Sequence, residues 1–261
     1  MRSIGPSYVA AISNDAFQQL SVATSGGPAC PQLQRLAWTS AYGWEHSQQF
    51  LSPHLVSVGF WHCINDRYAD LGLNSAIYPL PTTHLETLSI AGYPPDTAPI
   101  RSALSEVVQR LNTCFKRIDV RSSLCDTAWG HLACLPKLES LRVSDTPSAE
   151  VLKSIHHNLT FPALKHVTLE LNGQYQHLPL FFSLLKSSPL KEVIVKGSVK
   201  IGHVGVPTEV AIAILKAELH RNMNALVFAR FHPADLTFIS HLGPFSSLKT
   251  LEGDTRCQES Q

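Results

Sequence analysis

The chain has 261 residues, of which 44% are hydrophobic and 16% charged, and its formal net charge is +1 at pH 7. With Lys and Arg scattered along the chain, this balance gives no electrostatic basis for binding nucleic acid or an acidic membrane surface. No apolar run approaches the length of a membrane span, and residues 9–12 are too few for a signal-peptide core. The six cysteines form no CxxC pair, so we expect reduced thiols in a cytoplasmic or nuclear protein.

Three regions follow from the sequence pattern. Residues 1–29 are expected to form an N-terminal segment with a short helix, which we interpret as the remnant of an upstream region, and residues 253–261 a polar C-terminal tail. Between them, over residues 30–252, an apolar signature of the form Leu-x-x-Leu-x-Val recurs. Its copies are Leu33/Leu36/Trp38, Leu55/Val58/Phe60, Leu85/Leu88/Ile90, Phe115/Ile118/Val120, Leu138/Leu141/Val143, Leu164/Val167/Leu169, Leu190/Val193/Val195, Met223/Leu226/Phe228 and, incompletely, Leu248/Leu251. Successive copies start about 27 residues apart on average, a spacing typical of irregular leucine-rich repeats.

Each copy predicts a short strand whose alternate side chains point inward. Four of the nine copies are entered through the same Pro-x-Leu step, at Pro31, Pro53, Pro136 and Pro162. Proline cannot donate to a strand ladder but is tolerated at, or just before, the first residue of a strand. Its recurrence at one offset therefore supports the phase of the repeat.

Helical patterns connect the predicted strands. Apolar residues share one helical face up to Leu111, behind a start signal at Asp96, Thr97 and Pro99. Further helices are predicted over residues 146–159, 181–187, 207–219 and 235–242. This alternation predicts an α/β, leucine-rich-repeat-like solenoid: a horseshoe arc with parallel strands on the concave face and irregular helices on the convex face.

Four runs carry a resemblance to a known family, namely CPQLQRLAWTS, LPKLESLRVSDTPSAEVLKSI, FPALKHVTLEL and HLPLFFSLLKSSPLKEVIVKG. They resemble the irregular leucine-rich region of fungal F-box proteins of the basidiomycete type. The resemblance implies repeats that recognise a client protein, whereas a ligase adaptor would bind only through a separate F-box. Nothing before Asn14 reads as an F-box, so we expect either a chain truncated at its N-terminus or a relative that has lost the ligase contact.

The leading functional hypothesis is a non-enzymatic protein-binding module, similar to the substrate-recognition region of cullin-based ubiquitin ligases. The alternative is a stand-alone intracellular scaffold with no role in ubiquitination. In either case, a client is expected on the concave face, on side chains that flank the middle and last apolar positions of each copy. The candidate partner-binding residues are Trp61, Arg117, Asp119, Arg121, Arg142, His166, Glu170 and Glu192.

Two interpretations of these residues remain open. Arg117, Arg121 and Arg142 are expected to stack into one patch, and arginine is well suited to recognise carboxylates and to anchor interfaces. Alternatively, neighbouring charges simply pair with one another on a solvated face. Trp61 is either an anchor for the client or packs under the adjoining loop.

Signals for catalysis or metal binding are weak. Cys125, Asp126 and His131 lie within seven residues, yet no motif of a cysteine enzyme surrounds them. His131 and Cys134, with Cys125, supply three potential metal ligands, whereas a closed zinc site needs four at tighter spacing. Cys114 and Cys134 precede apolar repeat positions and are expected to pack in the core. We therefore predict no catalytic residue, no metal and no cofactor.

Overall fold

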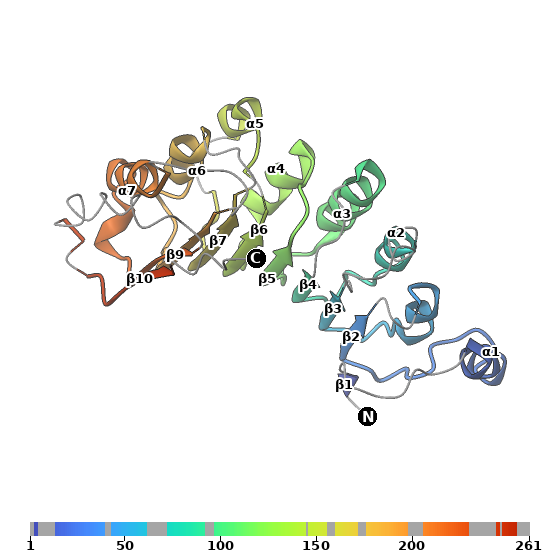
Figure 1. Ribbon diagram of the computed structural model, residues 1–261. Coiled ribbons are helices and arrows are strands. Elements are labelled where there is room, and N and C mark those ends of the chain that lie inside the picture. The colour runs from blue at the N-terminus through green and yellow to red at the C-terminus, as the bar shows by residue number, and fades with distance from the viewer. Residues whose placement is uncertain are drawn as a thin grey trace, which may run out of the picture. The chain divides into compact units, whose positions relative to one another are not determined.

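A computed structural model of the chain describes residues 3–4, 14–39, 43–61, 72–91, 97–144, 146–155, 160–171, 176–197, 206–229, 244–245 and 247–254. The chain divides into two compact units, here called the N-terminal unit (Met1–Ala128) and the C-terminal unit (Trp129–Gln261). In each unit short parallel strands alternate with helices, as Figure 1 shows. The α/β class predicted from the sequence is thereby confirmed.

The N-terminal unit pairs its strands in parallel and strictly in chain order, from β1 to β5. Its elements are β1 (Ser3–Ile4), α1 (Asn14–Ala23), β2 (Arg35–Thr39), η2 (Glu45–Phe50), β3 (Ser57–Trp61), α2 (Leu73–Ile77), β4 (Thr87–Ala91), α3 (Ala98–Arg110) and β5 (Arg117–Val120). Helices α2 and α3 lie along one side of the strands (Figure 1). Helix α1 confirms the short helix expected before residue 30, whereas β1 was not predicted.

The C-terminal unit repeats this arrangement, and β6 to β10 also pair in parallel in chain order. Its elements are β6 (Ser140–Val143), α5 (Ala149–Ser154), β7 (His166–Glu170), α6 (Leu178–Leu184), β8 (Glu192–Lys196), α7 (Val206–Lys216), η4 (Leu219–Arg221), β9 (Ala225–Ala229) and β10 (Thr250–Asp254). Helix α4 (Asp126–Cys134) includes residues from both units. Strand β10 extends two residues into the predicted tail, where Gly253 and Asp254 pair with Phe228 and Ala229.

The apolar triplets form the core at the phase that the sequence predicts. In all eight complete copies the three side chains are at most 4% exposed. Their middle residues also lie in register across paired strands. In the N-terminal unit Leu36, Val58, Leu88 and Ile118 align, and in the C-terminal unit Leu141, Val167, Val193 and Leu226 align. Each repeat therefore stacks its apolar side chains on those of the next.

One backbone motif recurs at the start of the strands. The carbonyl of Gln34 accepts the N–H groups of both Val56 and Ser57, at 2.8 and 3.1 Å. The same doubly accepting carbonyl is found at Val56, Glu86, Glu139, Lys165, Lys191 and Asn224, always toward two successive residues of the following repeat. Because only backbone groups take part, repeats of unrelated sequence keep the same geometry.

The prolines of the Pro-x-Leu steps lie in turns, not at the first residue of a strand. Leu55 donates its N–H to the carbonyl of Ser52 at 3.1 Å, which places Pro53 second in a four-residue turn. The equivalent bonds run from Leu33 to Cys30, from Leu138 to Leu135 and from Leu164 to Phe161. Proline is favoured at this second position because its φ is already fixed near the value that the turn requires. Each turn thus places the leucine that ends it in the core, shortly before the strand begins.

The helix predictions are confirmed in part. Helices α3, α6 and α7 lie where apolar periodicity predicted them. The helix expected over 146–159 is wrong at its start, because the Ser148 hydroxyl accepts the N–H of Val151 at 3.4 Å and α5 begins only at Ala149. Helix α5 ends at Ser154. The helix expected over residues 235–242 lies outside the described residues. Helices α2, α4 and η2 were not predicted.

Candidate functional site

Every strand from β2 to β9 turns one set of alternate side chains into the core and the other set outward. In β2, for example, Leu36 and Trp38 are buried, whereas Arg35, Ala37 and Thr39 are exposed or partly exposed. This alternation follows from the pleat of a strand that is covered on one side only. We call the outward side chains of a unit its open face, and every candidate partner-binding residue lies on a strand of an open face or, for Arg121, directly after one.

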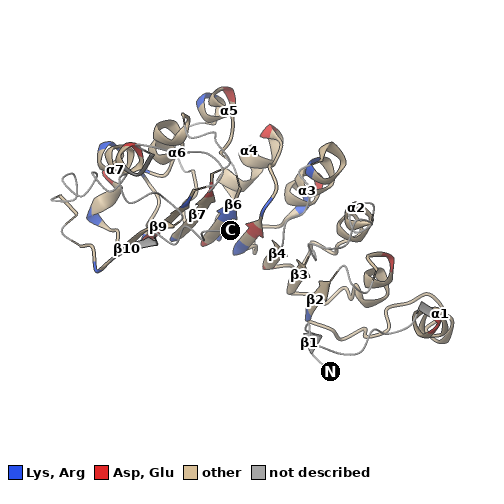
Figure 2. Cartoon of the chain, viewed as in Figure 1, with Lys and Arg blue, Asp and Glu red and all other residues tan. Residues whose placement is uncertain are grey.

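The open face of β2, β3 and β4 is almost uncharged. Its members are Arg35, Ala37, Thr39, Ser57, Gly59, Trp61, Thr87, Ser89 and Ala91, of which Ala91 is itself buried. Figure 2 accordingly shows these three strands in tan apart from the start of β2. Elsewhere in both units positively and negatively charged residues are interspersed along the chain (Figure 2).

Trp61 is the prominent side chain of this surface. It is 49% exposed, whereas Trp38, Trp44 and Trp129 are at most 4% exposed. Its indole Nε1 lies 3.6 Å from the point where a Cβ on Gly59 would stand, so the ring leans along β3 over that glycine. The half-exposed ring agrees with an available anchor, and the loop of the alternative interpretation, residues 62–71, lies outside the described residues.

The remaining candidates of the N-terminal unit follow in register with β4. Arg117 is exposed and lies opposite Thr87, and the partly buried Asp119 lies opposite Ser89. Arg121 directly follows β5 and is also partly buried. Arg142 belongs to the C-terminal unit, so the clustering of the three arginines stays a prediction.

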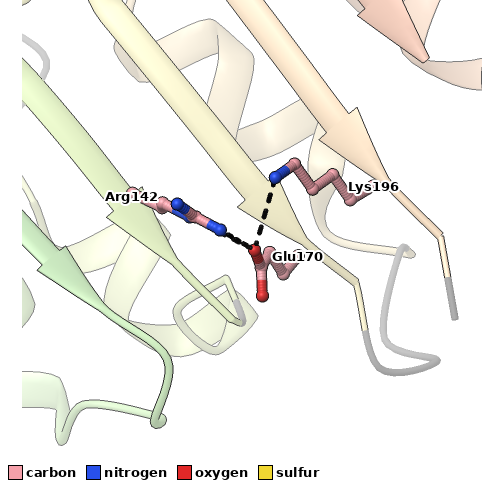
Figure 3. A network of polar contacts seen from close by, with 3 residues as sticks. All are labelled: Arg142, Glu170 and Lys196. Atoms are coloured by element: carbon pink, nitrogen blue, oxygen red, sulfur yellow. Dashed lines mark hydrogen bonds and ion pairs between the residues drawn. The ribbon is translucent and has the colours of Figure 1, made fainter. Parts of the chain in front are cut away.

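Three charged side chains meet on the open face of the C-terminal unit, as Figure 3 shows. Glu170 on β7 is bonded by Arg142 from β6, whose Nε lies 3.2 Å from Glu170 Oε1 and whose Nη2 bonds the same oxygen. Lys196 from β8 places its Nζ 3.7 Å from that oxygen. The three side chains are 19 to 26% exposed, so solvent screens this network less than it screens a fully exposed pair.

A second polar contact lies at the other end of the same strands. His166 Nδ1 is 3.0 Å from Glu192 Oε2, and both side chains are more than one third exposed. In this unit Arg142 and Glu170 therefore pair with each other, as the second interpretation of the charged candidates predicts, and His166 contacts Glu192. The repeat pattern also places Lys196 on this face, but it was not among the candidate residues, and the structure pairs it with Glu170 in register.

A row of uncharged side chains lies between the network around Glu170 and the contact of His166 with Glu192. Thr168, Ile194 and Val227 are in register across β7, β8 and β9, and all three are partly exposed. Ile194 and Val227 were not among the candidates, because the prediction favoured charged side chains. An apolar centre bordered by paired charges is the usual anatomy of a protein–protein interface.

Cys125 lies away from the strands, where it directly precedes α4 and faces a groove of about 730 Å³ beside α3. Partial burial of the Cys125 thiol raises its pKa. Hydrogen bonds from the hydroxyls of Ser105 and Thr127, and from the backbone N–H groups of Ala128 and Thr127, lower the pKa by more than burial raises it. The net effect is a lowered pKa. The sulfur lies 3.1 Å from Thr127 Oγ1. This setting favours the thiolate, the form of cysteine that reacts with electrophiles.

The expected burial of Cys114 and Cys134 is wrong, since both are exposed. The neighbouring core positions are taken by Phe115 in one case and by Leu132 and Ala133 in the other. Within the described part of the chain, no group of three or more His, Cys, Asp or Glu side chains is placed to hold a metal ion. The same residues include no helix that is long and apolar enough to cross a membrane.

The chain matches no model of a known protein family and no curated protein.

Proposed function

We propose that the chain is a leucine-rich-repeat-like solenoid with a concave open face that binds a protein client, and that it is not an enzyme. The observation that carries this proposal is the repeat itself: in-phase buried triplets on strands paired in chain order, with the opposite side chains left open. A doubly wound sheet, in contrast, reverses its strand order at the point where it binds its ligand. The uninterrupted order within each unit supports stacked repeats instead.

The resemblance of the repeat runs to fungal F-box proteins supports a role similar to substrate recognition in cullin-based ubiquitin ligases. The stand-alone scaffold differs from it only in lacking the ligase. The four described cysteines are free thiols, which supports a cytoplasmic or nuclear location for either. Neither role includes nucleic acid, a membrane or a cofactor.

Adaptor binding separates these two roles. Because no run in these 261 residues resembles an F-box, we expect the purified chain not to bind a ligase adaptor. Robust co-purification of the adaptor with this chain would contradict that expectation.

Charge reversal tests where the client binds. Once proximity labelling and cross-linking have identified a client, Arg117→Glu and Glu192→Lys should each weaken its binding by about tenfold, a loss typical of an interface contact that matters. Lys153→Glu on α5 and Lys216→Glu on α7 are the matched controls, exposed on the helical side, and should stay within about twofold. Thermal unfolding should be nearly unchanged in all four variants. Equal loss from both sets, or loss only from the helical set, would end the proposal.

A further inference from the structure

We propose that the open face of β2, β3 and β4 binds an uncharged, extended segment of the client, with Trp61 as the anchor on which an aliphatic or proline side chain stacks. This inference rests on the proposed function, because it takes the open face to be the binding surface. It names the part of that face that carries the contact and the chemistry of the segment that fits it.

The first support is the position of Trp61 among small neighbours. On the two adjacent strands, Thr39 and Ala91 lie opposite Trp61, and Ala37 and Ser89 lie opposite Gly59. None of these side chains is long enough to cover an indole ring that stands next to it. The ring therefore keeps 49% of its surface exposed even though it lies on a strand in the interior of the sheet.

The second support is the fit between the indole and Gly59. Nε1 lies 3.6 Å from the position of a Cβ on Gly59, an ordinary van der Waals distance, so the indole leans over the β3 backbone at that glycine. A ring that packs against the backbone in this way loses less conformational freedom when a partner stacks on it than a ring surrounded by solvent. Aromatic anchors of this kind dominate the binding energy of many protein interfaces.

Charge and hydrogen bonding define the partner. Arg35, at the start of β2, is the only charged residue among the nine open-face positions of β2 to β4. A charged client residue placed over the other positions would lose water without gaining an opposite charge. A nucleic acid is likewise disfavoured, because its phosphates need several cations.

The hydroxyl groups on this surface favour an extended protein segment. Ser57, Thr87 and Ser89 each place one hydroxyl on the open face, and a hydroxyl both donates and accepts hydrogen bonds. The backbone of an extended segment presents N–H and C=O groups in alternation and can use both capacities. The segment would thus bind through its backbone and through one apolar side chain on Trp61.

Trp61 also supplies a direct readout. It is the one exposed tryptophan of the four in the chain, so acrylamide quenching of the fluorescence reports on this surface, while the three buried tryptophans report on the fold. The probe is a set of synthetic peptides selected from a random-peptide phage library on the immobilised full chain. We expect the enriched peptides to be uncharged and to protect Trp61 from acrylamide.

Variants then test the assignment. Trp61→Ala should weaken binding of the selected peptides by at least about tenfold, and Trp61→Phe should restore part of it. Gly59→Val should also weaken binding, because the larger side chain displaces the indole. Arg101→Ala on α3, an exposed arginine of the same unit that lies outside the open face, is the control and should stay within about twofold. Unchanged emission from the buried tryptophans verifies that each variant is folded.

Three results would overturn the inference: selected peptides that are charged, peptides that bind Trp61→Ala as well as the unmodified chain, or a selection that yields no peptide protecting Trp61. The identified client separates this failure from failure of the proposed function. If Arg117→Glu or Glu192→Lys weakens client binding and Trp61→Ala does not, the open face binds the client but not through Trp61. If none of the three weakens it, the proposed function itself falls.

Discussion

Cys125 directly precedes α4, and its sulfur receives hydrogen bonds from two hydroxyls and two backbone N–H groups, which lower the pKa of the thiol. The thiolate is the nucleophile in alkylation, so a lowered pKa moves the pH midpoint of the reaction downward. We expect iodoacetamide to modify Cys125 in the folded chain at a lower pH than it modifies the same cysteine in the urea-unfolded chain. Mass spectrometry after timed alkylation over a range of pH measures this midpoint.

The hydroxyls that face the sulfur provide the controls. Thr127→Val removes one donor and should raise the midpoint, and Ser105→Ala should do the same. Ser105 is buried, and its hydroxyl also accepts the Cys125 N–H at 2.8 Å, so Ser105→Ala can disturb the fold. The midpoint of Ser105→Ala is therefore compared only if its thermal unfolding is little changed. A midpoint that is equal in the folded and unfolded chains would show that these contacts do not stabilise the thiolate.

At this scale the sequence predicts positions better than contacts. Alternation along each strand placed Trp61, Arg117 and Glu170 on the open faces, and the structure agrees. The pairing of Arg142 with Glu170 joins residues 28 positions apart, and it depends on a register that only the stacked repeats define. The exposure of Cys114 escaped prediction for a related reason, because its local pattern does not reveal that Phe115 takes the core position.

Ion pairs that link neighbouring strands differ in how far their side chains are exposed to solvent. Arg142, Glu170 and Lys196 join β6, β7 and β8 and are 19 to 26% exposed. Lys116 and Glu86 form a comparable pair just before β5 and β4, at 2.8 Å, but their side chains are 47 and 36% exposed. The two pairs therefore allow a matched comparison of partly buried and solvated charge.

Double-mutant cycles should separate the two pairs. For Arg142→Ala with Glu170→Ala we expect a coupling free energy of about 1 kcal/mol, because two guanidinium nitrogens bond one carboxylate oxygen in a partly desolvated place. For Lys116→Ala with Glu86→Ala we expect less than about 0.5 kcal/mol, as for most exposed pairs. Denaturant unfolding of the single and double variants measures both values. A larger coupling for the exposed pair would contradict this order.

The longest helix was predictable from the sequence because its apolar side chains recur with a clear helical period. Ala98–Arg110 completes more than three turns, and its apolar face was recognised. Leu73–Ile77 has only five residues, and Glu45–Phe50 carries mainly polar ones, so neither shows apolar periodicity. Such short helices are stabilised by packing against the strands and not by their own sequence. Their absence from the prediction reflects that tertiary origin.

Within each unit, stability is expected to be distributed over the contacts between neighbouring repeats. The apolar triplets align across strands, and the doubly accepting carbonyls tie each strand to the next. In such an architecture the free energy of unfolding is roughly a sum of terms for single repeats and for their interfaces. A defect in one repeat should then weaken its two neighbours more than distant parts of the same unit.

Leu164→Ala tests this expectation in the C-terminal unit. Leu164 is completely buried at the first position of its triplet, and its repeat supplies β7, which pairs with β6 on one side and β8 on the other. We expect the free energy of unfolding to fall by about 2–5 kcal/mol, as for other leucines truncated in a packed core. Amide hydrogen exchange should accelerate in β6, β7 and β8 more than in β10. Lys191→Ala, at an exposed position, is the control and should change neither quantity measurably. An unchanged denaturation midpoint for Leu164→Ala would show that the repeat phase is wrong, and acceleration confined to β7 would show that neighbouring repeats do not share their stability.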